Sequence, residues 1–350
     1  MKKFILTLSA VFAAVIFSGC GHTPVRSVFP AALPPEIAAV KESAARAESF
    51  KKIIAPAEVR GIGLFPAAFA GEFSNEQIFN AVKVLGFNRI YCQLTSEMEL
   101  DSRLVDFLTA ANAADLPVEL VFNQQDFYRR YRGNRLIRNF FIQYPDLAEV
   151  MEETVEFIND ELPENVKVAG VTVILAPHLF NGSNFQRIQG HLYCWSEKRY
   201  GIGEDNDMLM RESLVLAEKI SKIPGLPPLT IAVPDFFHDA ASEGKLSCGK
   251  VEDFAKLSAK VAVVSSANLP SKIFDTVSDE FSAMPEGKKA LAVIRLAGHT
   301  SLETGRLRRR NWQDFQRTMA YFMSKSAGVP AFGGIIVTPL AVIEYLRQEK

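Results

Sequence analysis

Residues 89–122 decide the fold, and they read RIYCQLTSEMELDSRLVDFLTAANAADLPVELVF. Two short apolar runs, 89–94 and 117–122, flank a segment in which apolar residues recur at helical spacing, namely Leu104, Leu108 and Ala111. Asp101 precedes this segment and can cap its first turn. The two runs alternate little between polar and apolar residues, as expected for strands buried on both faces of a parallel sheet. The stretch therefore predicts one strand–helix–strand unit.

The same alternation of apolar runs and amphipathic segments extends from residue 59 onward. Eight runs are predicted to be strands: Val59–Phe65, Arg89–Leu94, Pro117–Phe122, Val168–Ala176, Leu229–Val233, Val261–Ser265, Leu291–Leu296 and Gly334–Thr338. A capping box, Ser74-Asn-Glu-Gln77, opens the helix after the first strand, and Gly86 ends it. Eight such units predict an α/β fold with a single (β/α)8 TIM barrel over residues 59–350.

An open doubly wound α/β sheet is the alternative architecture for this pattern. Its dinucleotide-binding members carry Gly-x-Gly-x-x-Gly after the first strand. Here Gly61 and Gly63 lie within the predicted strand, and no third glycine follows at the required spacing. The P-loop and Gly-x-Ser-x-Gly motifs are also missing from the sequence, so no cofactor is expected.

The composition is typical of a folded globular protein. The chain has 350 residues, 48% of them hydrophobic, with 39 Lys and Arg against 40 Asp and Glu. Disordered chains combine fewer apolar residues with a larger net charge. A formal net charge of −1 also argues against a nucleic-acid partner, since such proteins are usually basic. The oligomeric state does not follow from the sequence.

The first 20 residues, MKKFILTLSAVFAAVIFSGC, have the features of an export signal: two lysines, an apolar stretch over 4–17, and small residues before Cys20. The ending Phe17-Ser18-Gly19-Cys20 resembles the lipobox of bacterial lipoproteins, with Phe17 where Leu is usual. That resemblance implies a signal peptide over 1–19, acylation of Cys20, palmitate included, and attachment to a membrane of the cell envelope. Gly21 replaces the Asp that often retains such proteins at the inner membrane, which favours the outer membrane in a Gram-negative host. An ordinary cleaved signal with an incidental Cys is the alternative.

Residues 20–58 are predicted to connect the lipidated Cys20 to the barrel. Four prolines make 21–35 suitable as a tether, and the Ala-, Glu- and Lys-rich segment 36–53 predicts a short helix packed under the domain as a spacer. Cys92 lies in an apolar run and is expected to be a buried thiol. Cys194 and Cys248 lie in predicted loops, where they either form a disulfide or remain free thiols.

The functional site of a TIM barrel is built by the loops that follow its strands. Those loops contain the carboxylates Glu97, Asp126 and Asp235 after strands 2, 3 and 5. They also contain the candidate ligand-binding side chains Tyr128, His178, Tyr193, Trp195, His238, Arg295 and His299. Aromatic faces stack on the C–H surfaces of sugars and polar groups bond their hydroxyls, so a glycan ligand is expected. The alternative is that these side chains only pack the loops together.

Arginines are concentrated in two of the predicted loops, at 129–138 and 306–310. If both loops lie at the mouth of the barrel, they form a positive rim suited to an anionic ligand such as an acidic glycan. Solvated surface charges paired with neighbouring acids explain them equally well.

An exported barrel whose loops combine aromatic, amide and carboxylate side chains resembles the glycoside hydrolases. That resemblance implies two carboxylates in acid and base or nucleophile roles. The commonest sugar-cleaving barrels place Glu at the ends of strands 4 and 7, where this sequence has His178 and His299. The predicted catalytic carboxylates are therefore Asp235 and Asp126, with Glu97 third. An inactive barrel that binds glycan without cleaving it is one alternative.

A metal-dependent hydrolase is a second alternative, with His178, His238, His299 and Asp235 as its ligands. Neither His-x-His nor His-Glu-x-x-His occurs in the sequence, and we predict no metal site.

Overall fold

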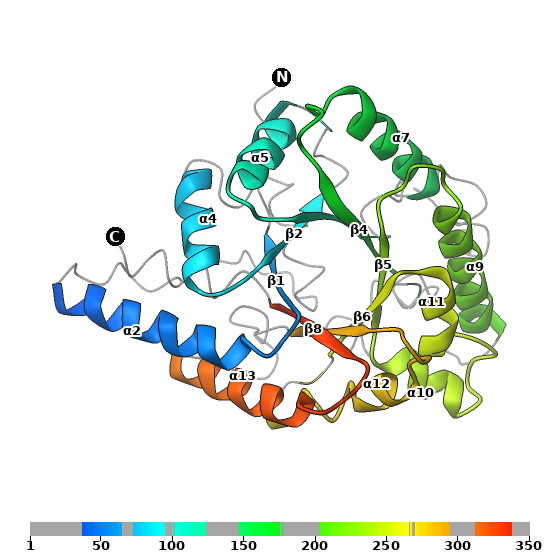
Figure 1. Cartoon of the computed structure of the whole chain (residues 1–350). Helices are drawn as coiled ribbons and strands as arrows, with labels where there is room; N and C mark the ends of the chain where they lie inside the picture. Colours follow the sequence, from blue (N-terminus) through cyan, green and yellow to red (C-terminus); the bar gives the residue numbers. More distant parts are fainter. Residues whose placement is uncertain are drawn as a thin grey trace, which may run out of the picture.

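The computed structural model describes residues 37–64, 73–94, 102–123, 147–175, 204–265, 270–294 and 312–337, together with Leu100, Pro177 and Ala267. Eight parallel strands within these ranges form a closed barrel in chain order (Figure 1). The strands are β1 Val59–Leu64, β2 Arg89–Leu94, β3 Val118–Asn123, β4 Val168–Ile174, β5 Leu229–Pro234, β6 Lys260–Val264, β7 Ala290–Ile294 and β8 Phe332–Val337.

Pairing between β1 and β8 closes the barrel. Its register runs from Val59 opposite Gly334 to Ile62 opposite Val337. An open doubly wound sheet would leave two edge strands without this pairing. The predicted TIM barrel is therefore confirmed, and the open-sheet alternative is excluded.

Helices surround the barrel and cover the outward faces of its strands (Figure 1). They are α2 Ile37–Ile54, α4 Asn75–Val84, α5 Ser102–Ala113, α7 Leu147–Asp160, α9 Glu204–Ser221, α10 Phe236–Ser242, α11 Val251–Leu257, α12 Ser278–Ala283 and α13 Trp312–Ser326, with a 3-10 turn, η4, at Pro270–Lys272. The capping box at α4 is confirmed, because Ser74 Oγ accepts from the Gln77 N–H at 3.2 Å and Gln77 Oε1 accepts from the Ser74 N–H at 3.0 Å. Asp101 lies outside the described residues.

Helix α2, the predicted spacer, is part of the helical layer and lies along α13 (Figure 1). Phe50 is fully buried and stacks on Phe315, with ring centroids 4.9 Å apart. The ring centroids of Trp312 and Phe87 lie 5.6 and 5.7 Å from that of Phe50. Burial of a phenylalanine of this kind stabilises a fold by about 1.5–3 kcal/mol, so α2 contributes to the stability of the barrel domain.

Side chains that alternate along the strands fill the inside of the barrel. The interior cluster consists of Val59, Tyr91, Val121, Ala232, Ala262, Val264, Leu291, Val293 and Ile336. Gly61 leaves space for the Tyr91 ring, because a Cβ at Gly61 would lie 2.4 Å from Tyr91 Cε2. The barrel is thus packed through its middle, which leaves no space for a ligand there.

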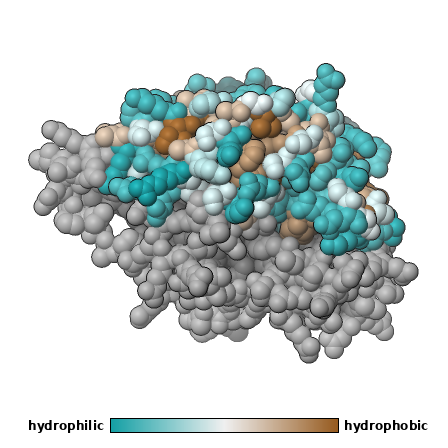
Figure 2. Space-filling view, turned by 90° about the horizontal axis from the view of Figure 1, so that it is seen from below, coloured by the Kyte–Doolittle hydropathy of each residue, from teal (hydrophilic) through white to brown (hydrophobic). Residues whose placement is uncertain are grey.

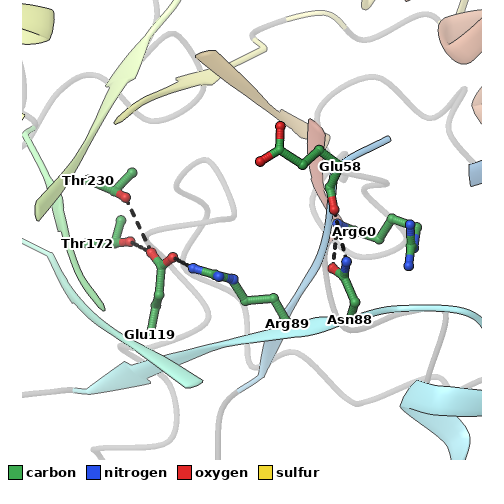
Figure 3. Close-up of polar contacts among 7 residues, drawn as sticks. All are labelled: Glu58, Arg60, Asn88, Arg89, Glu119, Thr172 and Thr230. Atoms are coloured by element: carbon green, nitrogen blue, oxygen red, sulfur yellow. Dashed lines mark hydrogen bonds and ion pairs between the residues drawn. The ribbon is translucent and has the colours of Figure 1, made fainter. Parts of the chain in front are cut away.

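A polar network occupies the amino end of the barrel interior (Figure 3). Glu119, near the start of β3, is buried and forms an ion pair with Arg89, the first residue of β2. Its other carboxylate oxygen accepts hydrogen bonds from Thr172 Oγ1 at 3.0 Å and Thr230 Oγ1 at 3.3 Å. Burial, and then the Glu119 charge, hold the pKa of Tyr91 well above its usual value. The ion pair between Arg89 and Glu119 is therefore expected to stabilise the fold, since the functional sites of TIM barrels form at the opposite end.

Arg60 and Asn88 connect β1 to β2 at the same end (Figure 3). The Arg60 N–H donates to Asn88 Oδ1 at 2.8 Å, and Asn88 Nδ2 donates to the Glu58 carbonyl at 2.9 Å. Arg60 Nε donates a hydrogen bond at 2.8 Å to the carbonyl oxygen of Gly86, two residues beyond the end of α4. These bonds fix the helix-to-strand turn before β2.

In the coloured part of the surface in Figure 2, hydrophilic residues are interspersed with hydrophobic ones. Within the described ranges, the exposed large hydrophobic side chains are Val215 and Tyr321. None of the described helices is both long enough and apolar enough to span a membrane.

Candidate functional site

The two ends of the barrel differ in the length of their connections. Segments from a helix to the next strand, at the amino end, are short, as in 85–88, 114–117 and 258–259. Segments from a strand to the next helix include 124–146, 175–203 and 295–311. Long connections in compact domains are usually functional, and in TIM barrels they build the site at the carboxyl end. The longest segments between the described elements therefore follow strands, at the carboxyl end of the barrel.

Two buried amides lie at this carboxyl end, on neighbouring strands. Gln93 is next to the last residue of β2 and Asn123 is the last residue of β3, and they are 3% and 0% exposed. Side chains alternate along a strand, and Tyr91 and Val121, two residues earlier, belong to the interior cluster. Gln93 and Asn123 therefore face the barrel interior and form a polar floor beneath its mouth.

Sequence reasoning did not select these two amides as site residues. The alternation of side chains along a strand could have indicated them. Each is a polar residue at an inward-facing position near the carboxyl end of an otherwise apolar strand. Amides at such a position can bond hydroxyl groups of a ligand as both donors and acceptors.

Asp235 directly follows β5, where the predicted loop proves to be the short helix α10. Its backbone is already helical, with φ −56° and ψ −37°, and its N–H donates to the Val264 carbonyl at 3.2 Å. The side chain is 2% exposed. The predicted carboxylate is thus buried between β5 and α10, and its charge contributes to the raised pKa of Glu280 on α12.

His238, a predicted ligand-binding residue, lies on α10 and contacts the start of α11. Its Nδ1 accepts a hydrogen bond from the Val251 N–H at 3.3 Å, and Glu252 Oε2 lies 3.8 Å from the same nitrogen. The side chain is 12% exposed. In the neutral ring the proton is therefore on Nε2, and the described contacts of His238 join two helices.

Acidic side chains gather where α10 and α12 meet. Glu280 is 2% exposed, and its burial, assisted by the charges of Asp235, Asp239 and Asp279, raises its pKa to about 9. The pKa of Asp239 is also raised, first by burial and then by Asp279. Glu280 is therefore a neutral carboxylic acid at pH 7.

The other predicted site residues lie outside the described residues. They are Glu97, Asp126, Tyr128, His178, Tyr193, Trp195, Arg295, His299 and Cys20, together with both arginine clusters. Their roles stay predictions. In the part of the chain that the structure describes, no group of three His, Cys, Asp or Glu side chains could hold a metal ion. Cys92 is a buried free thiol, as predicted, and Cys248 is a free thiol that is half-buried.

No protein-family model matches the chain, and no curated protein is similar to it in sequence. Several solved structures are similar in shape. A chitinase from Chromobacterium violaceum is 12% identical, with 83% of this chain and 99% of that one covered and a TM-score of 0.45. The spore cortex-lytic enzyme SleL from Bacillus cereus is 8% identical, with 91% and 86% covered and a TM-score of 0.47.

A β-1,4-D-mannanase from Cryptopygus antarcticus is 13% identical, with 83% and 90% covered and a TM-score of 0.44. The fold assignment for this chain comes from its own strand pairing, which closes an eight-stranded parallel barrel.

Proposed function

We propose that this protein is a membrane-anchored, exported barrel that binds a glycan at the carboxyl end of its strands and acts on it by carboxylate acid and base chemistry. The observation that carries the proposal is the asymmetry between the ends. One end combines the long connections with the buried amides Gln93 and Asn123, whereas the other is closed by short turns and by the Glu119 network. Buried amides at the carboxyl end of the barrel suit a ligand that is rich in hydroxyl groups.

The catalytic roles are proposed for Asp235 and Asp126, with Glu97 third. Glycoside cleavage requires a proton donor and a second carboxylate. The distance between these two carboxyl groups, about 5–10 Å, decides the stereochemical outcome. Asp235 is buried and directly follows β5, at the carboxyl end of the barrel. The loop sequences around Asp126 supply aromatic and basic side chains, including Tyr128, that suit a sugar with acidic groups.

The anchoring part of the proposal rests on the lipobox-like sequence that ends at Cys20. Several acyl chains on one residue would hold the protein at a membrane, because each buried methylene contributes about 0.8 kcal/mol. A barrel anchored in this way would meet glycans of the cell envelope.

The proposal is tested by screening the chain without residues 1–19 against neutral and acidic glycans for binding and for release of reducing ends. Asp126→Asn, Asp235→Asn and Glu97→Gln are compared with Glu161→Gln, an exposed acid at the amino end. Turnover is expected in the wild type and to fall at least about 100-fold when a catalytic carboxylate is lost. Binding without turnover in every form would support the inactive glycan-binding barrel. The absence of both binding and turnover in the wild type would refute the proposal.

A further inference from the structure

Gly63 is a glycine that neither the backbone conformation nor the packing of the barrel requires. It is the next-to-last residue of β1, and its φ is outside the left-handed region that favours glycine. A Cβ at Gly61 or at Gly334 would overlap other atoms, whereas a Cβ at Gly63 would have, among the described residues, a single atom within 4 Å, the Val337 carbonyl oxygen at 3.7 Å. Glycine weakens the interior of a strand and often marks a place where a ligand approaches the backbone closely.

Solvent reaches the inside of the barrel at Gly63. Side chains alternate along a strand, and Gly61, two residues earlier, faces the interior, so Gly63 faces it as well. Gly63 is partly exposed, although Ile62 and Leu64 on either side of it are buried. Ile174, the last residue of β4, is also partly exposed and packs against the interior cluster. The interior is therefore accessible at the carboxyl ends of β1 and β4.

The buried amides Gln93 and Asn123 lie between these two exposed positions, because β2 and β3 are the strands between β1 and β4 in the barrel. Their amides can both donate and accept hydrogen bonds. None of the last inward-facing positions of these four strands has a charged side chain.

The opposite side of the barrel differs in its side chains. The last inward-facing positions of β6, β7 and β8 are filled by Val264, Val293 and Ile336, which are buried and belong to the interior cluster. Branched side chains of this kind are the usual filling of TIM barrels. The glycine and the two amides on the β1–β4 side therefore depart from the packing that the barrel alone would need.

We propose that Gly63 is the specificity-determining position of a subsite that holds one uncharged, hydroxyl-bearing sugar unit on the β1–β4 side of the barrel mouth. The missing side chain lets the sugar ring approach the β1 backbone, the amides of Gln93 and Asn123 bond its hydroxyl groups, and Ile174 contacts its C–H surface. The identity of the ligand rests on the proposed function. The access of small molecules to Gly63 does not.

Cysteine labelling tests this access without any glycan. Gly63→Cys and Ala262→Cys are introduced separately into the full chain, and peptide masses report the reaction of each new thiol with methyl methanethiosulfonate. Ala262 is the matched control, because it is a small inward-facing residue that is fully buried. The thiol at position 63 is expected to react at least about 10-fold faster, since accessible thiols react and buried ones are inert. Equal rates would overturn the proposal whatever the protein binds.

Glycan binding by Gly63→Val and Gly63→Ala tests the ligand. Hexasaccharides of glucose, mannose and N-acetylglucosamine are the uncharged probes, oligogalacturonate is the fully acidic one, and calorimetric titration measures their affinities. Gly63→Val is expected to bind an uncharged probe at least about 10-fold more weakly than the wild type, because its side chain occupies the space of the sugar ring. Gly63→Ala should show a smaller loss, and it replaces Gly63→Val in the test if the larger side chain prevents folding.

The outcomes separate this inference from the proposed function. Equal affinities in the wild type and both variants, or binding of oligogalacturonate alone, would overturn the subsite and leave the proposed function intact. A wild type that binds no glycan would contradict the proposed function and the sugar ligand together. Fast labelling of Gly63→Cys in that protein would still show that small molecules enter the barrel at this position.

Discussion

At the scale of single residues, polar side chains inside the barrel have different roles at its two ends. Glu119 and its partners close the amino end, where each carboxylate oxygen has a donor. Gln93 and Asn123 lie at the carboxyl end, near the last residues of β2 and β3. The inward-facing positions of the strands thus carry a stabilising network at one end and a polar floor at the other.

Glu119→Gln is expected to destabilise the protein by about 3 kcal/mol, because it leaves Arg89 without its carboxylate partner. Chemical unfolding at pH 7 measures this loss. Glu161→Gln, at an exposed position, should change the free energy of unfolding by no more than about 0.5 kcal/mol. Equal stabilities of the two variants would show that the network does not hold the barrel together.

Gly334 is required where β8 meets β1. Its φ is +143°, and a Cβ there would lie 2.1 Å from the Val59 carbonyl oxygen. Because backbone atoms cannot move aside as a side chain can, Gly334→Ala should cost about 3 kcal/mol or more, or prevent folding. Gly63→Ala is the control, since its Cβ would lie at an ordinary 3.7 Å from the Val337 carbonyl oxygen. Thermal denaturation compares the two, and a Gly334→Ala variant as stable as Gly63→Ala would contradict the closure described for β1 and β8.

At the scale of elements, the strands and most helices were predictable because each follows a local pattern. The apolar runs, the capping box and the glycine at the end of α4 each specify a local structure through neighbouring residues. Helix α10 was missed because its seven residues are too few to show a helical repeat, and the burial of Phe237 is visible only in the folded structure. The Glu119 network was also missed, since its residues are far apart in sequence and meet only when β2 to β5 pair.

Helix α2 provides a prediction at this scale. Phe50→Ala should destabilise the protein by about 3–5 kcal/mol, because it opens a cavity against Phe315, Trp312 and Phe87. Glu48→Ala, an exposed position on the same helix, serves as its control. A Phe50→Ala protein that unfolds at the same urea concentration as Glu48→Ala would show that α2 is only a tether.

At the scale of the whole molecule, anchoring and recognition are separable properties. Cys20→Ser should move the protein from the membrane fraction to the soluble fraction, because the acyl chains that would hold it there can no longer be attached. Fractionation of cells that express the two forms, with mass measurement of the N-terminal peptide, tests this. Retention of Cys20→Ser in the membrane fraction would refute a lipid anchor at that residue.

The central claim is that the carboxyl end of the barrel is a glycan site, and the most direct measurement is glycan binding by variants of its polar floor. Asn123→Ala and Gln93→Ala are compared with Glu161→Gln by calorimetric titration with whichever glycan the wild type binds, after circular dichroism has shown that all are folded. The account predicts affinity reduced at least about 10-fold in both floor variants and unchanged in Glu161→Gln. Equal affinity in all four proteins, or no glycan bound by the wild type, would contradict it.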